Sequence, residues 1–269
     1  MICAGIDAGS RTIKVVLLGG DGLDVLASGV ADQGVEQEAL AMQLLDRLLQ
    51  ENNADRRDLA AVVATGYGRK LIGAADETIT EITCQAWGVR RRMADARMIV
   101  DIGGQDSKLL RLNADGTVDD FMMNDRCAAG TGRFLEVVAT RLGVTLDSLG
   151  ELASKSRKPA AISSMCVVFA ETEIIGLMAS GVTREDIAAG VQASVAARVA
   201  AMARRSFTLP IIFTGGVAMV PGMDAALESA IGKPIAVAPD PQTTGALGAA
   251  ILAARRLSGA KTAFPREPD

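Results

Sequence analysis

Two stretches of the chain carry the same short series of chemically useful residues. Asp7 and Lys14 lie in IDAGSRTIKVVLL, residues 6–18, which aligns without a gap onto VDIGGQDSKLLRL, residues 100–112. In each copy an apolar strand ends in Asp, turns through Gly and returns as a strand that carries Lys, so one hairpin is used twice. Asp7 and Asp101 would stand at equivalent strand ends, where two carboxylates suit a Mg²⁺ ion held through water. The alternative is that both are turn formers, since Asp is common in turns.

Cys127 and Cys166 are further candidates for chemistry, because each comes just before a predicted helix. The unpaired N–H groups at a helix N-terminus stabilise a thiolate. A [4Fe–4S] cluster takes four thiolates, so a chain that offers two would supply four as a homodimer. The alternative is that both are small buried hydrophobic residues. Cys3 and Cys84 are expected to pack in the core, and an intrachain four-cysteine site remains the second possibility.

Five glycines are expected at strand ends, where their bare backbone N–H groups would surround a shared cleft and suit a polyphosphate. They are Gly9, Gly66, Gly103, Gly215 and Gly245. The usual nucleotide signatures are missing from the sequence, because no GxxxxGK[ST] occurs and the two GxG runs lack the third glycine of a dinucleotide fingerprint. A P-loop and a Rossmann site are therefore disfavoured.

The composition excludes several classes of site and partner. The 269 residues include no histidine, which removes His-based nucleophile pairs, His general bases and His metal ligands. The net charge of −4 offers no general attraction to nucleic acid or anionic lipid. Apolar residues make up 49% of the chain, but no apolar run approaches the about 18 residues of a membrane span. The N-terminus lacks a secretory leader, so we expect a cytoplasmic protein in which disulfides are disfavoured.

The elements that must position these residues follow an α/β pattern. We expect two similar lobes that face each other: lobe I over residues 1–96, completed by a C-terminal helix over 244–257, and lobe II over 97–243 with Cys127 and Cys166. Residues 258–269 are expected to form a flexible tail.

Periodicity and turn signals predict the individual elements. The clearest helix covers 183–204 and starts with Thr183-x-x-Asp186, which resembles a capping box. Asp115-Gly116 marks a hairpin turn. The other expected helices cover 37–50, 81–94, 132–142, 167–180 and 244–256, and the expected strands include 59–65, 98–102 and 209–214.

Nearly the whole chain, residues 5–254, carries a series of motifs in a fixed order: IDAGSRTIK, ATGYGR, DIGGQDSK, NDRCAAGTGRF, ISSMCVVFAETE, TGGVA and TGALGAA. Together they resemble the activator ATPases, or component A, of 2-hydroxyacyl-CoA dehydratases, within the wider benzoyl-CoA reductase ATPase group. The resemblance implies the acetate kinase, sugar kinase, Hsp70 and actin fold, in which two ribonuclease-H-like lobes clamp ATP in a cleft.

The resemblance also implies which residues bind ATP. The first phosphate loop would contain Gly9, Ser10, Arg11, Thr12 and Lys14, and the second would contain Gly103, Gly104 and Gln105. Further contacts would come from Gly130, Thr131 and Gly132, and from Gly215, Gly216 and Val217 beside the adenosine. Because the chain has no histidine, Asp101 and Gln105 are candidates to orient the attacking water, with Asp7 as a third catalytic candidate.

These features predict an ATP-gated one-electron donor with a [4Fe–4S] cluster shared across a homodimer. It would take an electron from ferredoxin or flavodoxin and pass it to an iron–sulfur partner. That partner would be a 2-hydroxyacyl-CoA dehydratase, an aromatic acyl-CoA reductase or a double-cubane-cluster reductase. A sugar or carboxylate kinase of the same fold and a non-redox assembly protein of the actin type are the alternatives. The basic run Arg90–Arg92 would meet an acidic partner or form a solvated helix face.

Overall fold

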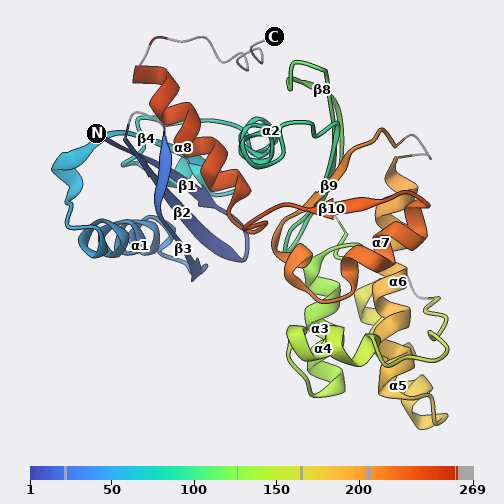
Figure 1. Ribbon diagram of the computed structural model, residues 1–269. Helices are drawn as coiled ribbons and strands as arrows, with labels where there is room; N and C mark the ends of the chain where they lie inside the picture. Colours follow the sequence, from blue (N-terminus) through green and yellow to red (C-terminus); the bar gives the residue numbers. More distant parts are fainter. Residues whose placement is uncertain (21–22, 126, 164–165, 204–206, 258, 260–269) are drawn as a thin grey trace. The chain divides into compact units, whose positions relative to one another are not determined.

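The computed structural model describes residues 1–20, 23–125, 127–163, 166–203, 207–257 and 259. The chain divides into two compact units (Figure 1). The first contains Met1–Arg97, Leu110–Asp120 and Ala238–Asp269, and the second contains Met98–Leu109 and Phe121–Val237. The tail expected to be flexible, 258–269, lies outside the described residues except for Gly259, and the lobe boundaries expected above stay a prediction.

Two five-stranded sheets repeat one topology. The first has the order β3-β2-β1-β4-β5, with β1 antiparallel to β2 and parallel to β4. The second has the order β10-β9-β6-β7-β8, with β6 parallel to β9. Read from its other edge, the second sheet repeats the first, strand for strand. The duplicated hairpin is therefore confirmed, and the repeated order agrees with the expected pair of ribonuclease-H-like lobes.

The strands of the first sheet are β1 (Ile2–Ala8), β2 (Thr12–Gly19), β3 (Asp24–Asp32), β4 (Leu59–Thr65) and β5 (Glu77–Thr78). Those of the second sheet are β6 (Met98–Ile102), β7 (Ser107–Leu112), β8 (Val118–Asn124), β9 (Ile211–Thr214) and β10 (Ile235–Val237). The central strands β1, β4, β6 and β9 are almost entirely buried, as their apolar sequences require.

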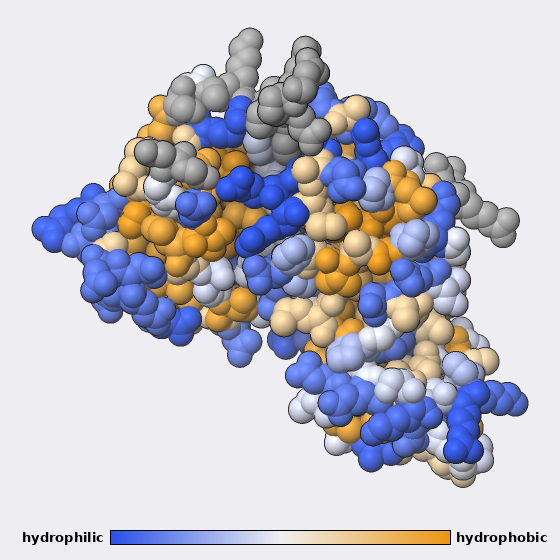
Figure 2. All heavy atoms as spheres, viewed as in Figure 1, coloured by the Kyte–Doolittle hydropathy of each residue, from blue (hydrophilic) through white to orange (hydrophobic). Residues whose placement is uncertain are grey.

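Helices cover both faces of the first sheet (Figure 1). On one face α1 (Gln37–Glu51) buries its leucines against β1 and β2, and its outer side is hydrophilic in Figure 2. On the other face lie α2 (Glu81–Arg92) and α8 (Thr244–Leu257). These two helices approach so closely that a Cβ on Gly248 would lie 1.7 Å from the carbonyl oxygen of Cys84. Only glycine permits this packing.

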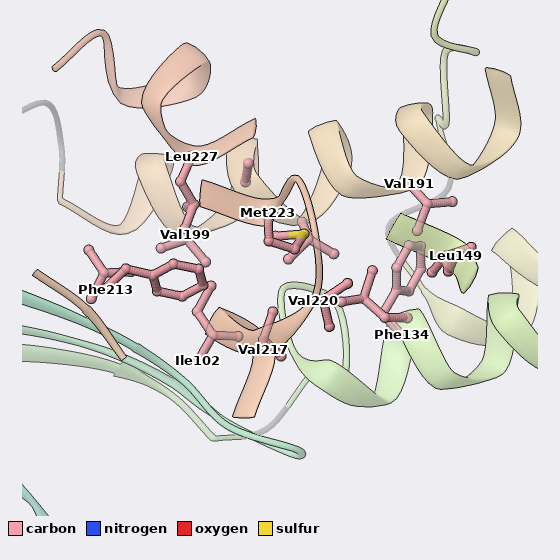
Figure 3. Packing of buried hydrophobic residues seen from close by; sticks show 14 of the residues in the cluster. Ile102, Phe134, Leu149, Val191, Val199, Phe213, Val217, Val220, Met223 and Leu227 are labelled. Carbon is pink, nitrogen blue, oxygen red and sulfur yellow. The ribbon is translucent and has the colours of Figure 1, made fainter. Parts of the chain in front are cut away.

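The second unit has one continuous core, beneath its sheet and among its helices (Figure 3). Ile102 and Phe213 project from the sheet toward Val217, while Phe134 and Val191 come from helices. The helices are α3 (Gly132–Leu142), α4 (Leu146–Ala153), α5 (Val167–Ala179), α6 (Arg184–Met202) and α7 (Met223–Ile231).

The expected start of the long helix α6 is half correct. The Thr183 hydroxyl accepts a hydrogen bond from the Asp186 backbone N–H, as predicted for an N-cap. The Asp186 carboxylate does not complete a capping box, because it accepts from the Ser156 hydroxyl and from the backbone N–H groups of Arg157 and Lys158. These bonds, led by the one from Ser156, lower the pKa of Asp186.

The expected elements otherwise agree with the observed ones within two residues, and helix 132–142 has the same bounds. The helix expected to reach 204 ends at Met202, and residue 204 lies outside the described part. The sequence did not predict β3, β5, β10, α4 or α7. It also missed three short 3-10 helices, Arg56–Asp58, Arg69–Leu71 and Gly216–Met219. Among the described residues, none of the helices combines the length and apolar character needed to span a bilayer.

Candidate functional site

The first half-site forms where β1 ends. Asp7 faces Lys14 across the β1–β2 ladder, and Lys14 Nζ lies 3.1 Å from Asp7 Oδ2. The Gly9 N–H donates to the Thr12 carbonyl at 3.1 Å and closes the turn between the strands. A Cβ on Gly9 would lie 2.9 Å from Lys14 Nζ, so the ammonium stands directly over this turn. A bare turn beside a cation suits a phosphate group.

Glycine is required beside Asp7. Gly66 has φ +90°, and a Cβ there would lie 2.4 Å from Asp7 Oδ1 and 2.7 Å from the Ala8 carbonyl oxygen. Gly245, in the first turn of α8, also approaches Asp7, because its Cβ would lie 3.5 Å from Oδ2. The structure thus brings Asp7, Gly9, Lys14, Gly66 and Gly245 together, as the sequence suggested.

The second half-site repeats this plan in the second unit. Asp101 pairs in register with Thr214, as Asp7 pairs with Thr65, and each Thr is followed by glycine. Gly215 has φ +88°, and a Cβ there would lie 2.5 Å from Asp101 Oδ1. Asp101 is 7% exposed. The same Asp–Thr-Gly contact therefore appears once in each unit.

The second glycine turn is held against the start of α3. The N–H groups of Gly132 and Arg133 donate to the carbonyls of Gly103 and Gly104, at 2.9 and 2.8 Å. Gly103 N–H donates in turn to the Asp106 carbonyl at 2.9 Å. Two of the α3 N-terminal donors are therefore occupied by the protein itself, and Gly132 supports the second glycine turn.

The other residues predicted to bind ATP differ in how exposed they are and in whether the side chain or the backbone is available to a ligand. Val217 is 4% exposed and its side chain points into the core (Figure 3), which leaves its backbone for a ligand. Gln105 is exposed at the tip of the second turn, where an amide can reach solvent or a phosphate. The rest of the predicted set differs in exposure: Arg11 is exposed, and Ser10, Thr12, Gly104 and Gly216 are half-buried, whereas Gly130 and Thr131 are buried.

Two glutamines near the first half-site were missed by the sequence reasoning. Gln33 Nε2 donates to the Gly9 carbonyl at 2.6 Å, and the Gln33 N–H donates to the Arg11 carbonyl, so Gln33 braces the first turn. Gln85 is buried and accepts a hydrogen bond from the Thr244 hydroxyl at 2.8 Å, which fixes the start of α8. No local pattern reveals either contact, because the partners are 24 and 159 residues apart.

The four cysteines fall into two classes. Cys3 and Cys84 are buried in the core of the first unit, as expected. Burial raises the pKa of both thiols, to about 12 for Cys84. A cluster ligand must be a thiolate, so this core opposes a role for either residue in an intrachain four-cysteine site.

Cys127 and Cys166 are exposed free thiols, both in the second unit. Cys166 is the N-cap of α5, as predicted. For Cys127 the expected helix does begin at Gly132, but its N-cap is Thr131, so the expectation that this thiol stands at the helix N-terminus is wrong. Cys127 instead lies in a loop shaped by Asn124, whose Nδ2 donates to the carbonyls of Cys127 and Ala129, each at 2.9 Å.

The arginines at the end of α2 make contacts within the first unit. Arg92 pairs with Asp240 at 3.0 Å, Arg90 donates to the Ala96 carbonyl and Arg91 to the Leu23 carbonyl. Within the described part of the chain, no group of three or more Cys, Asp or Glu side chains is placed to hold a metal ion.

Residues 4–253 match the BadF/BadG/BcrA/BcrD ATPase family. The chain belongs to this family. It is 44% identical over 254 residues to the activator of lactoyl-CoA dehydratase from Anaerotignum propionicum. The aligned region covers 94% of this chain and 97% of the relative. Membership confirms the resemblance seen in the motifs and makes the protein an ATP-binding ATPase of the activator type.

Two solved structures of family members are similar over almost the full length. The activator of the 2-hydroxyisocaproyl-CoA dehydratase from Clostridium difficile, with bound ADPNP, has a TM-score of 0.91 at 40% identity and covers 96% of each chain. Component A of the (R)-2-hydroxyglutaryl-CoA dehydratase from Acidaminococcus fermentans has the same TM-score and identity, and covers 96% of this chain and 99% of its own. The α/β fold of the acetate kinase, sugar kinase, Hsp70 and actin class is thereby confirmed.

Proposed function

We propose that this family member is an ATP-driven one-electron donor whose [4Fe–4S] cluster is held between two copies by Cys127 and Cys166 of each. The observation that carries the proposal is the division of the cysteines into an exposed pair in one unit and two buried thiols in the other. A cubane takes four thiolates, and two chains supply four from the exposed pairs.

The surroundings of Cys166 fit this role. As the N-cap of α5, its sulfur stands at a helix end whose first N–H groups favour a negative charge. Four apolar side chains of α5 are exposed, with Phe169 at 69% and Val168 at 67%. A second copy would remove such apolar surface from water, which favours association. The other two are Ile175 and Met178.

ATP hydrolysis would be carried by the paired half-sites. Lys14 and the turn from Gly9 to Thr12 would bind phosphate oxygens by charge-assisted hydrogen bonds. Asp101 and Gln105 would orient the water that adds to the γ-phosphorus while the bond to the bridging oxygen breaks, which yields ADP and phosphate. Asp7 and Asp101 would hold Mg²⁺ through water, and the bound ion would supply charge neutralisation at the phosphates.

The electron balance is simple. When bound, the cluster supplies a one-electron redox centre. Reduced ferredoxin or flavodoxin would give one electron to the dimer, and one electron would leave to an iron–sulfur partner. Relatives named as activators of CoA-ester dehydratases support a dehydratase or a related reductase as that partner. The proposed location is the cytoplasm.

Anaerobic purification tests the proposal directly. We expect brown protein that runs as a dimer and carries about four iron atoms per dimer. Cys127→Ser and Cys166→Ser should each lose iron while keeping nucleotide binding. Cys3→Ala is the matched control, because the Cys3 thiol is buried and its removal should leave the iron content unchanged. Intact protein that contains no iron and cannot be reconstituted would overturn the proposal.

A further inference from the structure

Lys108 has an environment that differs sharply from that of its repeat equivalent, Lys14. Its side chain is 2% exposed, whereas that of Lys14 is 15% exposed. Lys108 Nζ lies 2.8 Å from Asp106 Oδ2 and 3.8 Å from Asp101 Oδ2. An ammonium buried this completely is stable only when it is paired with carboxylates and hydrogen-bonded.

The two glycine turns are covered by opposite charges. A Cβ on Gly9 would meet Lys14 Nζ at 2.9 Å, whereas a Cβ on Gly103 would meet Asp106 Oδ1 at 2.7 Å. The first turn therefore presents a cation, which suits a phosphate. At the second turn the Asp106 carboxylate takes the position that Lys14 has at the first turn, and its charge is balanced by the buried Lys108 ammonium. The two equivalent lysines therefore differ in their surroundings: Lys14 lies over a glycine turn, whereas Lys108 is buried beside two carboxylates.

We propose that Lys108 is a positioning residue that fixes Asp101 and the second glycine turn through one buried ammonium, without touching the nucleotide. Asp101 is the penultimate residue of β6, and the backbone carbonyl of Asp106 closes the turn by accepting the Gly103 N–H at 2.9 Å. The ammonium is shared by both carboxylates, so it sets the distance between the carboxylate that orients water and the turn that holds phosphate. This inference rests on the role proposed above for Asp101.

The test compares Lys108→Met with Lys14→Met in the anaerobically purified protein. Misplacing a water-orienting carboxylate by about 1 Å costs on the order of 100-fold in rate. We therefore expect Lys108→Met to lower kcat for ATP hydrolysis by at least about tenfold, with little change in the Kd for ADP. Lys14→Met should instead weaken ADP binding by about tenfold or more, since a charge-assisted hydrogen bond is lost. Weakened ADP binding by Lys108→Met with kcat unchanged would overturn the proposal.

The double variant Lys108→Met/Asp106→Asn separates positioning from a purely structural role. Removing one member of a buried ion pair is strongly destabilising, whereas removing both charges together is tolerated far better. We expect the double variant to recover most of the Tm lost in Lys108→Met and still bind ADP, yet to keep the low kcat. Recovery of kcat together with Tm would show that Lys108 only supports the fold.

This double variant also serves if Lys108→Met alone does not fold, because its kcat, Tm and ADP affinity test the proposal independently. The iron content of every variant is measured in parallel. Protein without iron would refute the electron-donor proposal. The Lys108 proposal would still be tested, because it depends on ATP hydrolysis and ADP binding and not on iron. Normal hydrolysis by Asp101→Ala would refute the water-orienting role, and with it the route by which Lys108 acts.

Discussion

Arg141, near the end of α3, forms an ion pair with Glu171 in α5, the helix that Cys166 caps. The other end of α3 donates through Gly132 and Arg133 to the carbonyls of the second glycine turn. One helix therefore connects the second glycine turn to the helix that Cys166 caps, within a single unit. Coupling between two sites requires a structural element whose position both sites influence. Helix α3 would be that element between a bound nucleotide and the proposed cluster.

Breaking that ion pair should uncouple hydrolysis from electron transfer. For Arg141→Met we expect ATP hydrolysis near the wild-type rate and a fall of about two- to fivefold in electrons delivered per ATP, because an exposed pair is worth up to about 1 kcal/mol. Arg133→Met is the matched control, since it removes an exposed pair with Glu136 on the same helix. An unchanged electron-to-ATP ratio in Arg141→Met would exclude this pair from the coupling route.

Asp101→Ala should abolish ATP-driven electron transfer and leave the visible absorbance of the cluster intact. Its carboxylate is the proposed orienter of the attacking water, and it lies away from both exposed cysteines in sequence and element. The measurement is ATP turnover and partner reduction in anaerobic protein of known iron content. Asp120→Asn, at an exposed carboxylate that pairs with Arg111, is the control. Wild-type turnover by Asp101→Ala would contradict the assignment.

Gly66→Ala and Gly215→Ala should lose ATP hydrolysis, because each introduced Cβ would displace the carboxylate beside it. At both positions φ is near +90° and the clash with Asp7 or Asp101 is 2.4 or 2.5 Å. Gly143→Ala isolates the backbone effect, since Gly143 also has positive φ but its Cβ would meet open space. We expect that control to lose about 1 kcal/mol of stability and to keep its ATPase activity.

The duplicated hairpin was predictable because its pattern is local. A strand that ends in Asp, a glycine turn and a returning strand with Lys are all within 13 residues, and strand-end glycines mark the same sites. Helix α3 was predictable for the same reason, from its apolar spacing. The candidate site was therefore largely visible in the sequence as two separate halves.

The missed features depend on contacts between distant segments. Gln33 braces Gly9, and Gln85 holds Thr244, through bonds that no spacing rule predicts. Burial made Lys108 unlike Lys14, although their local sequences are equivalent. The helix start at Gly132 was predicted correctly, but Cys127 does not stand at that helix end, because Thr131 is the N-cap and four residues separate the thiol from the helix. Strands β5 and β10 are only 2 and 3 residues long, too short to leave a periodic signal.

The buried thiol of Cys84 gives a prediction for alkaline pH. Burial raises the pKa of Cys84 to about 12, from 9.0 for an unperturbed thiol. Between these values the folded state keeps its proton and the unfolded state releases it, so the free energy of unfolding falls as pH rises from 9 toward 12. The slope from this one group is about 1.4 kcal/mol per pH unit, and there is no contribution below pH 9.

Cys84→Ala should remove that slope, although it lowers stability at every pH by leaving a small cavity. The measurement is the free energy of unfolding of both proteins between pH 8 and pH 10.5, under reducing conditions. Other groups that titrate in this range are common to both proteins, so the difference between the two curves isolates the thiol. We expect that difference to stay constant up to about pH 9 and then to shrink. A constant difference across the range would mean that Cys84 ionises as readily in the folded state as in the unfolded one, and that this core is more accessible to water than its packing indicates.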